Sequence, residues 1–167
     1  LGWALYEATL VSSQSARRAA KLEIVLADAA HADGTTFWLD GVSLFPSDAV
    51  AGLFRRDLFE KLSNLRSPGG FMRTPGGNFL EGYGSRSRWN WRATLGHWLS
   101  RPGHYNGAWG YWVTDGFGLF EMLVLAELLG AEAQLSIYTG YSMHQPYVPL
   151  NQSSAFVQDA LDVLEFA

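Results

Sequence analysis

The residues best suited to chemistry lie in the stretch FMRTPGGNFLEGY, from Phe71 to Tyr83. A short apolar run ends in Arg73, and the turn Pro75-Gly76-Gly77 then leads to Asn78. Glycines let a backbone turn pass close to a ligand, and a guanidinium and an amide offer several hydrogen-bond donors beside it. Two interpretations follow from these residues alone: a ligand-binding strand end, or a structural ion pair beside an ordinary turn.

Tryptophan is concentrated just downstream, where five of the 7 tryptophans fall between positions 89 and 112. An aromatic ring on a loop can offer a flat apolar face to a ligand, and Trp109 and Trp112 are candidates for such a role. Packing of a long loop explains either of them equally well, and packing is the favoured interpretation for Trp89, Trp91 and Trp98.

The same region holds His97 and His104, but no acidic residue stands at metal-ligand spacing from them. Neither a zinc site nor a catalytic triad is therefore predicted. The chain has no cysteine, which excludes disulfides, thiolate metal sites and cysteine nucleophiles. We predict no metal and no cofactor.

The composition is that of an ordinary globular protein of 167 residues, with 48% hydrophobic residues and a net charge of −4. The mild negative charge argues against nucleic acid or an anionic membrane as partner. No apolar run approaches the length of a membrane span.

The elements that must position these residues fall into two parts. Residues 1–46 alternate apolar and polar side chains, as in KLEIVLAD and TTFWLDGVSLF, and predict antiparallel strands with a turn at Asp33-Gly34. After Pro46, Ser47 or Asp48 can cap a helix that carries Leu53 to Leu65 on its apolar face.

Next come a strand through Arg73 and a long loop over residues 76–111. A helix follows that begins at Thr114 and Asp115 and ends at Gly130. The strand AEAQLSIYTG and a last helix from Ser153 complete the chain. This alternation predicts a parallel sheet with helices outside it. The apolar faces of three helices need more sheet to pack on than two parallel strands provide. We therefore expect this sequence to be a segment of a longer protein.

In order, several segments resemble glycoside hydrolases of family 51, the α-L-arabinofuranosidases: TTFWLDGVSLFP, LFRRDLFEKLSNL, FMRTPGGNFLEGY, RWNWRATLGHW, RPGHYNGAWGYWVTDGFGLFEML and LGAEAQLSI. The resemblance implies an α/β fold, part of a (β/α)₈ TIM barrel preceded by the last antiparallel strands of a β-sandwich like a carbohydrate-binding module. Residues 1–46 would end the sandwich, and residues 47–167 would be a partial barrel carrying strands 2 and 3.

The resemblance also implies site roles. Arg73 would orient the nucleophilic carboxylate, and Asn78 would bind a furanose hydroxyl. Trp109 and Trp112 would lie beside the glycosidic bond. Tyr138 stands after strand 3, where the family commonly has asparagine, and would line the pocket differently. Thr74 likewise replaces the apolar or aromatic residue usual before the turn.

Family chemistry is retaining hydrolysis by two glutamates, both expected outside this chain. Glu81, Glu121, Glu127 and Glu132 are therefore not nominated as catalytic. The last three are interpreted as charges on helix surfaces or helix ends.

The function implied is that of a segment of an enzyme that hydrolyses terminal α-L-arabinofuranosyl residues of arabinan- or arabinoxylan-type polysaccharides. The remaining barrel segments would come from the same polypeptide or a companion chain, and the segment alone would be inactive. The resemblance places the protein outside the cell or in an organelle lumen. One alternative is a non-catalytic carbohydrate-binding or structural subunit of the same fold, and another is a stand-alone small α/β domain. Two glutamates in the remainder would identify the enzyme.

Overall fold

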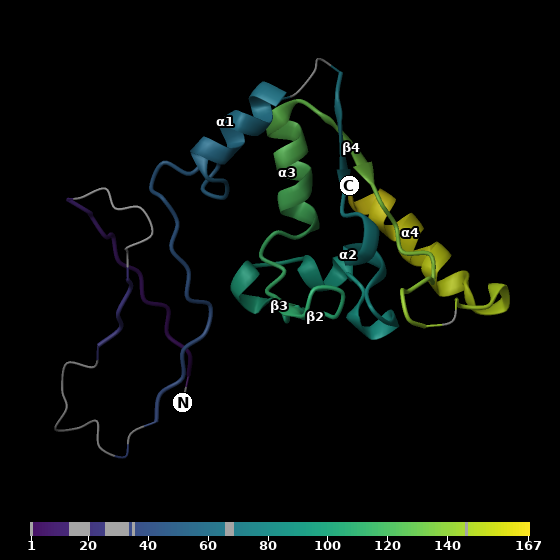
Figure 1. Cartoon of the computed structure of the whole chain (residues 1–167), viewed down its shortest axis with the longest axis horizontal. Helices are drawn as coiled ribbons and strands as arrows, with labels where there is room; N and C mark the ends of the chain where they lie inside the picture. Colours follow the sequence, from purple (N-terminus) through teal and green to yellow (C-terminus); the bar gives the residue numbers. More distant parts are fainter. Residues whose placement is uncertain (1, 14–20, 26–33, 35, 66–68, 146) are drawn as a thin grey trace. The chain divides into compact units, whose positions relative to one another are not determined.

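The computed structural model describes residues 2–13, 21–25, 34, 36–65, 69–145 and 147–167. The chain divides into two units, Leu1–Asp40 and Gly41–Ala167. All helices and strands of the described residues belong to the second unit (Figure 1). None of the described helices has the length and apolarity needed to cross a membrane.

The predicted antiparallel strands are wrong for the part of residues 1–46 that the structure describes, because no strand forms there. Strands persist when neighbours take up their N–H and C=O groups and cover one face. No strand ladder is formed by the described residues of this segment, and Trp3 and Trp38 are 75% and 77% exposed. Asp33, of the predicted turn, lies outside the described residues. The assignment of this segment to a β-sandwich stays a prediction.

Helix α1 spans Arg56–Leu65 and begins later than predicted. Leu53 and Phe54 lie instead in a turn where Phe54 N donates to Val50 O at 3.0 Å. The turn contains two residues at positive φ, Ala51 at 53° and Gly52 at 69°, and this left-handed backbone cannot continue a helix. Asp48 caps nothing here and forms an ion pair with Arg56 at 3.3 Å.

The predicted parallel pairing is confirmed. β1, Phe71–Thr74, pairs in parallel with β4, Glu132–Leu135. Helix α3, Leu119–Leu129, connects them in the chain and packs against both strands (Figure 1). Among the described residues this sheet has two strands only, so one edge of each strand carries no partner.

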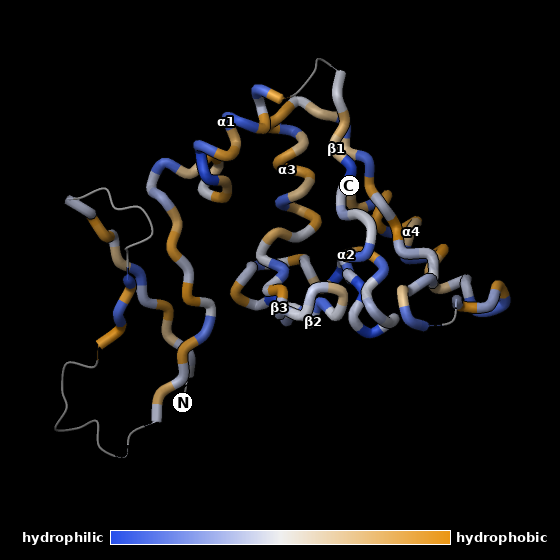
Figure 2. Tube along the Cα trace, viewed as in Figure 1, coloured by the Kyte–Doolittle hydropathy of each residue, from blue (hydrophilic) through white to orange (hydrophobic). Residues whose placement is uncertain are grey.

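α3 is held by its sequence at both ends. The Glu121 carboxylate accepts from Gly118 N at 2.8 Å, and Gly130 ends the helix in the left-handed conformation. The helix begins after the predicted Thr114 and Asp115 because Asp115 has φ 57°, outside the helical region. Apolar residues predominate along α3 (Figure 2), and one face is buried: Leu119, Met122, Leu125, Ala126 and Leu129.

The predicted long loop contains regular structure. α2, Gly77–Glu81, is followed by three short 3₁₀ helices, Ser85–Ser87, Trp91–Thr94 and Trp98–Ser100. The antiparallel strands β2, His104–Asn106, and β3, Tyr111–Val113, then form a hairpin. A fourth 3₁₀ helix, Leu150–Gln152, precedes α4, Ser154–Phe166, which confirms the predicted last helix.

The core gathers around the loop tryptophans. Trp89 and Trp91 are 4% and 6% exposed, which confirms their interpretation as packing residues, and Trp98 is half-buried. Trp91 Nε1 donates to Asp159 Oδ1 of α4 at 3.0 Å, so this loop is fastened to the last helix. The buried cluster consists of Leu80, Trp89, Trp91, Leu119, Met122, Tyr138 and Val163.

Candidate active site

The carboxyl ends of β1 and β4 lie at the same edge of the sheet, because the two strands are parallel. Arg73 pairs in register with Gln134, and Thr74 with Leu135. Ser136 N donates to Thr74 O at 3.0 Å, so the pairing continues to the last residue of β1. The segments that leave this edge carry the residues predicted to bind substrate.

Arg73 presents its guanidinium at this edge. The side chain lies against Gly76, where a Cβ would stand 2.8 Å from Arg73 Cζ. Only glycine therefore leaves the guanidinium in its present place. Among the described residues the side chain of Arg73 has neither a hydrogen-bond nor an ion-pair partner, so its guanidinium N–H donors are available to an acceptor such as a carboxylate.

The turn after β1 delivers Asn78 to the start of α2. Gly76 is extended, with φ −157°, and Gly77 has φ 57°, a conformation that favours glycine. Asn78 is exposed, and its backbone carbonyl accepts from Gly82 N at 2.9 Å. No hydrogen bond among the described residues engages its side-chain amide, which can therefore bind a ligand.

The β2–β3 hairpin displays the two tryptophans of the predicted cleft. Asn106 Oδ1 accepts from Ala108 N at 3.1 Å and from Trp109 N at 3.2 Å, which fixes the hairpin turn. Trp112 pairs with Tyr105 across the hairpin. Trp109 and Trp112 remain 55% and 61% exposed, so both rings can stack on a sugar.

Two contacts hold the hairpin against the segment that follows Asn78. The rings of Phe79 and His104 lie with their centroids 5.6 Å apart. Gly107 packs on Tyr83 so closely that a Cβ at position 107 would stand 2.6 Å from Tyr83 Cβ. The structure therefore brings the tryptophan-bearing hairpin and the Asn78 segment together.

Tyr138 lies in the hydrophobic core, only 7% exposed. Its hydroxyl is 2.9 Å from Ser142 Oγ, which in turn donates to Glu81 O at 2.7 Å. The Arg88 guanidinium lies 5.1 Å from the centre of the Tyr138 ring. The structure does not present this ring on the surface beside Arg73, and its role in substrate binding stays a prediction.

The family of the chain follows from its sequence relatives. A family model described as the Alpha-L-arabinofuranosidase 1 domain matches residues 61–167, which carry both parallel strands and the hairpin. The chain belongs to the α-L-arabinofuranosidases of glycoside hydrolase family 51. The resemblance found in the sequence motifs is thereby confirmed.

Individual arabinofuranosidases show the extent of the similarity. Alpha-L-arabinofuranosidase 1 of Arabidopsis thaliana is 39% identical over 133 residues, which are 79% of this chain and 19% of that protein. An arabinose-bound family 51 α-L-arabinofuranosidase has a TM-score of 0.62 and 39% identity, over 68% of this chain and 18% of that one. The enzyme of Thermotoga petrophila gives a TM-score of 0.51 and 28% identity over 68% and 19%. The chain thus spans about a fifth of the length of these relatives.

Two side-chain pairs of this arabinofuranosidase-family chain, Arg101–Glu121 and His104–Asp115, were not predicted from the sequence. Glu121 is a helix-end charge, as one of the two interpretations had it, since it lies in the first turn of α3. It is not a surface charge, because its side chain is 8% exposed and forms an ion pair with Arg101 at 2.7 Å. His104 does have an acidic partner, Asp115, with Nδ1 and Oδ2 2.9 Å apart. Recognition of the hairpin would have revealed this second pair, since the strands of the hairpin bring its two residues together. Glu127 and Glu132 are exposed, as predicted for surface charges.

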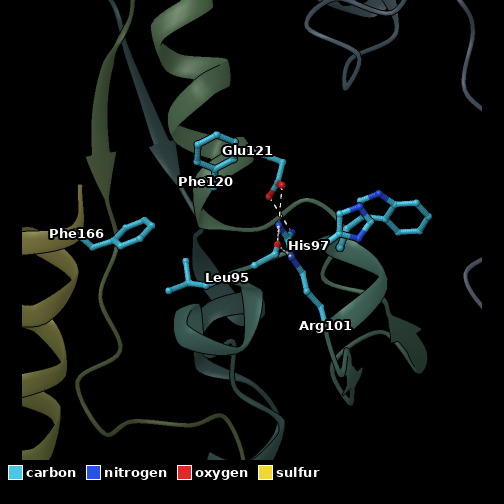
Figure 3. Close-up of a pocket in the computed structure, with 8 residues that line it drawn as sticks. Leu95, His97, Arg101, Phe120, Glu121 and Phe166 are labelled. Atoms are coloured by element: carbon cyan, nitrogen blue, oxygen red, sulfur yellow. Dashed lines mark hydrogen bonds and ion pairs between the residues drawn. The ribbon is translucent and has the colours of Figure 1, made fainter.

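The buried Arg101–Glu121 pair joins the loop to the start of α3. Burial opposes ionisation of Glu121, but hydrogen bonds from Arg101 and from backbone N–H groups outweigh it and hold the pKa of Glu121 below its ordinary value of 4.5. Figure 3 shows Arg101 reaching the Glu121 carboxylate beside a pocket of about 360 Å³ that is otherwise lined mainly by apolar side chains, among them Leu95, Phe120 and Phe166. No group of three metal-ligating side chains occurs in the part of the chain that the structure describes.

Proposed function

We propose that β1 and β4 are the second and third strands of the barrel of a retaining α-L-arabinofuranosidase. The enzyme would remove terminal α-L-arabinofuranosyl residues from arabinan- or arabinoxylan-type polysaccharides. The observation that carries this proposal is the guanidinium of Arg73, which has no partner among the described residues and lies at the carboxyl end of a parallel strand. In a (β/α)₈ barrel the active site is built at the carboxyl ends of the strands.

The proposed chemistry assigns positioning to this chain. In retaining hydrolysis one carboxylate attacks the anomeric carbon while a second carboxyl group protonates the leaving oxygen. Arg73 would donate hydrogen bonds to the attacking carboxylate and keep it ionised. Asn78 would hold a furanose hydroxyl, and Trp109 and Trp112 would stack on the sugar chain. Both catalytic glutamates would lie in other segments of the barrel.

The two-stranded sheet supports the need for those segments. Within the described residues β1 and β4 are each hydrogen-bonded along one side only. α3 also leaves large apolar side chains exposed, such as Phe120 at 53% and Leu128 at 43%. Further barrel strands and helices, from the same polypeptide or a companion chain, would cover these surfaces.

Hydrolysis of p-nitrophenyl α-L-arabinofuranoside by the full-length protein that contains this chain tests the proposal. We expect turnover by the wild type and a kcat about 10²- to 10³-fold lower for Arg73→Ala, as for loss of a group that stabilises a reacting charge. Arg55→Ala is the matched control, because Arg55 is exposed and its ion-pair partner among the described residues is Asp57 alone. A wild type that binds arabinan without turnover would contradict the proposal and favour the non-catalytic subunit.

A further inference from the structure

His104 and Asp115 form a buried polar pair beside the predicted site. The hairpin register pairs His104 with Val113, two residues before Asp115, so the hairpin brings the imidazole and the carboxylate together. Their side chains are only 13% and 3% exposed. Since a carboxylate accepts hydrogen bonds, Nδ1 donates to Asp115, and in the tautomer with its proton on Nδ1 the other ring nitrogen, Nε2, is an acceptor.

Each member of the pair keeps one polar atom without a partner. Among the described residues no hydrogen-bond partner reaches His104 Nε2 or Asp115 Oδ1, and both atoms are buried. Asp115 also has φ 57°, a strained conformation for a residue with a side chain. Buried unpaired polar atoms and backbone strain are costly, and where they occur together they point to a functional site.

Both residues line one pocket of about 160 Å³. A water molecule occupies about 30 Å³ in the liquid, so the pocket has room for more than a single bridging water. The remaining lining residues include two arginines and an amide: Arg86, Arg88 and Asn90. The pocket therefore combines acceptors, at Asp115 and His104, with residues that can donate.

The charges around the pocket decide the chemistry of its ligand. The carboxylate of Asp115 disfavours an anion, and the arginines disfavour a cation. A neutral group with several hydroxyls satisfies both, because each hydroxyl donates one hydrogen bond and accepts others. Two neighbouring sugar hydroxyls could each donate a hydrogen bond, one to His104 Nε2 and the other to Asp115 Oδ1.

We infer that His104 and Asp115 bind two neighbouring hydroxyls of the sugar unit next to the terminal arabinofuranosyl residue. This inference rests on the proposed function, in which Asn78 holds the terminal unit. Phe79 follows Asn78 in the chain, and its ring lies 5.6 Å from the imidazole of His104. The pocket that His104 lines therefore adjoins the segment that carries Asn78, and the next unit of the sugar chain would lie there.

Comparison of two substrates tests the inference in the full-length protein. α-1,5-Linked arabinotriose has a second sugar unit, and p-nitrophenyl α-L-arabinofuranoside does not. For His104→Gln and for Asp115→Asn we expect KM for arabinotriose to rise about tenfold more than KM for the single-sugar substrate, since each loses a hydrogen bond to a buried group. His97→Gln is the matched control, because His97 is exposed and lies outside this pocket.

The possible results separate the inference from the proposed function. Equal losses with both substrates, or no loss with either, would overturn the role of this pocket while leaving the hydrolase intact. A wild type that hydrolyses neither substrate would overturn the proposed function. Calorimetric binding of arabinotriose would then decide the inference by itself, with weaker binding by Asp115→Asn supporting it and unchanged binding refuting it. Should His104→Gln fail to fold, Asp115→Asn carries both comparisons.

Discussion

Arg101 and Glu121, which lie 20 residues apart in the chain, form a two-point ion pair in the interior. Arg101 Nη2 donates to Oε1 at 2.7 Å, and Nη1 donates to Oε2 at 2.9 Å. Nη1 also donates to Asp115 O at 2.7 Å, so the same guanidinium reaches the backbone of the strained residue. The pair therefore links the hairpin, the loop before it and the first turn of α3.

Removal of the charge of Glu121 is expected to destabilise the fold strongly. Glu121→Gln leaves the Arg101 guanidinium buried without its counter-charge, which costs about 3–5 kcal/mol in the free energy of unfolding. Urea unfolding of the full-length protein measures this change. Glu127→Gln on the exposed side of α3 serves as control and should change stability by less than about 0.5 kcal/mol. Equal stability of the two variants would show that the ion pair contributes nothing.

The free energy of unfolding should also decrease as the pH is lowered, and part of this decrease should depend on Glu121. Its pKa is lower in the folded protein than the ordinary value of 4.5, so the ion pair contributes fully above that pH. As the pH decreases from there through the folded pKa, the unfolded state takes up the proton first and the contribution disappears. Unfolding free energies at several pH values should show the difference between wild type and Glu121→Gln shrinking toward low pH. A difference that is constant with pH would contradict this assignment.

The elements predicted best were those with a complete local signal. α4 and the C-terminal end of α3 have periodic apolar residues and a stop, and the β1–β4 pairing followed from the alternation of strands and helices. The prediction of strands in residues 1–46 is wrong for the described part. Alternation of apolar and polar residues indicates which side chains a strand would bury, but a strand also needs a neighbouring strand to pair with, and the alternation does not provide one.

The candidate site was predicted in part for the same reason. Arg73 and the turn after it are contiguous in sequence, so their proximity was readable. The His104–Asp115 and Arg101–Glu121 pairs join residues 11 and 20 positions apart, and each depends on how the loop folds back. A carboxylate near the end of a predicted helix gives no sign that a distant arginine will pair with it, which is why the burial of Glu121 was not predicted.

Gly76→Ala should reduce activity with little loss of stability. Position 76 is extended, with φ −157°, so alanine fits the backbone there. Its Cβ would meet the end of the Arg73 side chain at 2.8 Å, and that flexible end would move away. A misplacement of about 1 Å at a catalytic group can cost roughly 10²-fold in rate, so we expect kcat for p-nitrophenyl α-L-arabinofuranoside to fall by about that factor.

Gly77→Ala separates displacement of the guanidinium from backbone strain. Gly77 has φ 57° and no atom within 4 Å of an added Cβ, so this variant strains the turn without touching Arg73. It should lose about 1–2 kcal/mol of stability, the cost of left-handed backbone for a residue with a Cβ, and keep more activity than Gly76→Ala. The reverse order of activities would show that Arg73 is not the residue affected.

Replacement of the exposed tryptophans should weaken binding of the polysaccharide without unfolding the protein. Trp109→Ala and Trp112→Ala each remove a ring that is more than half exposed, so little buried surface is lost. An aromatic stacking contact contributes about 0.5–1.5 kcal/mol, which corresponds to a rise in KM for arabinan of roughly two- to twelve-fold. Trp91→Ala is the contrasting variant, because Trp91 is 6% exposed and its loss should lower the melting temperature. A large loss of stability for Trp109→Ala or Trp112→Ala, with KM unchanged, would assign that tryptophan to packing.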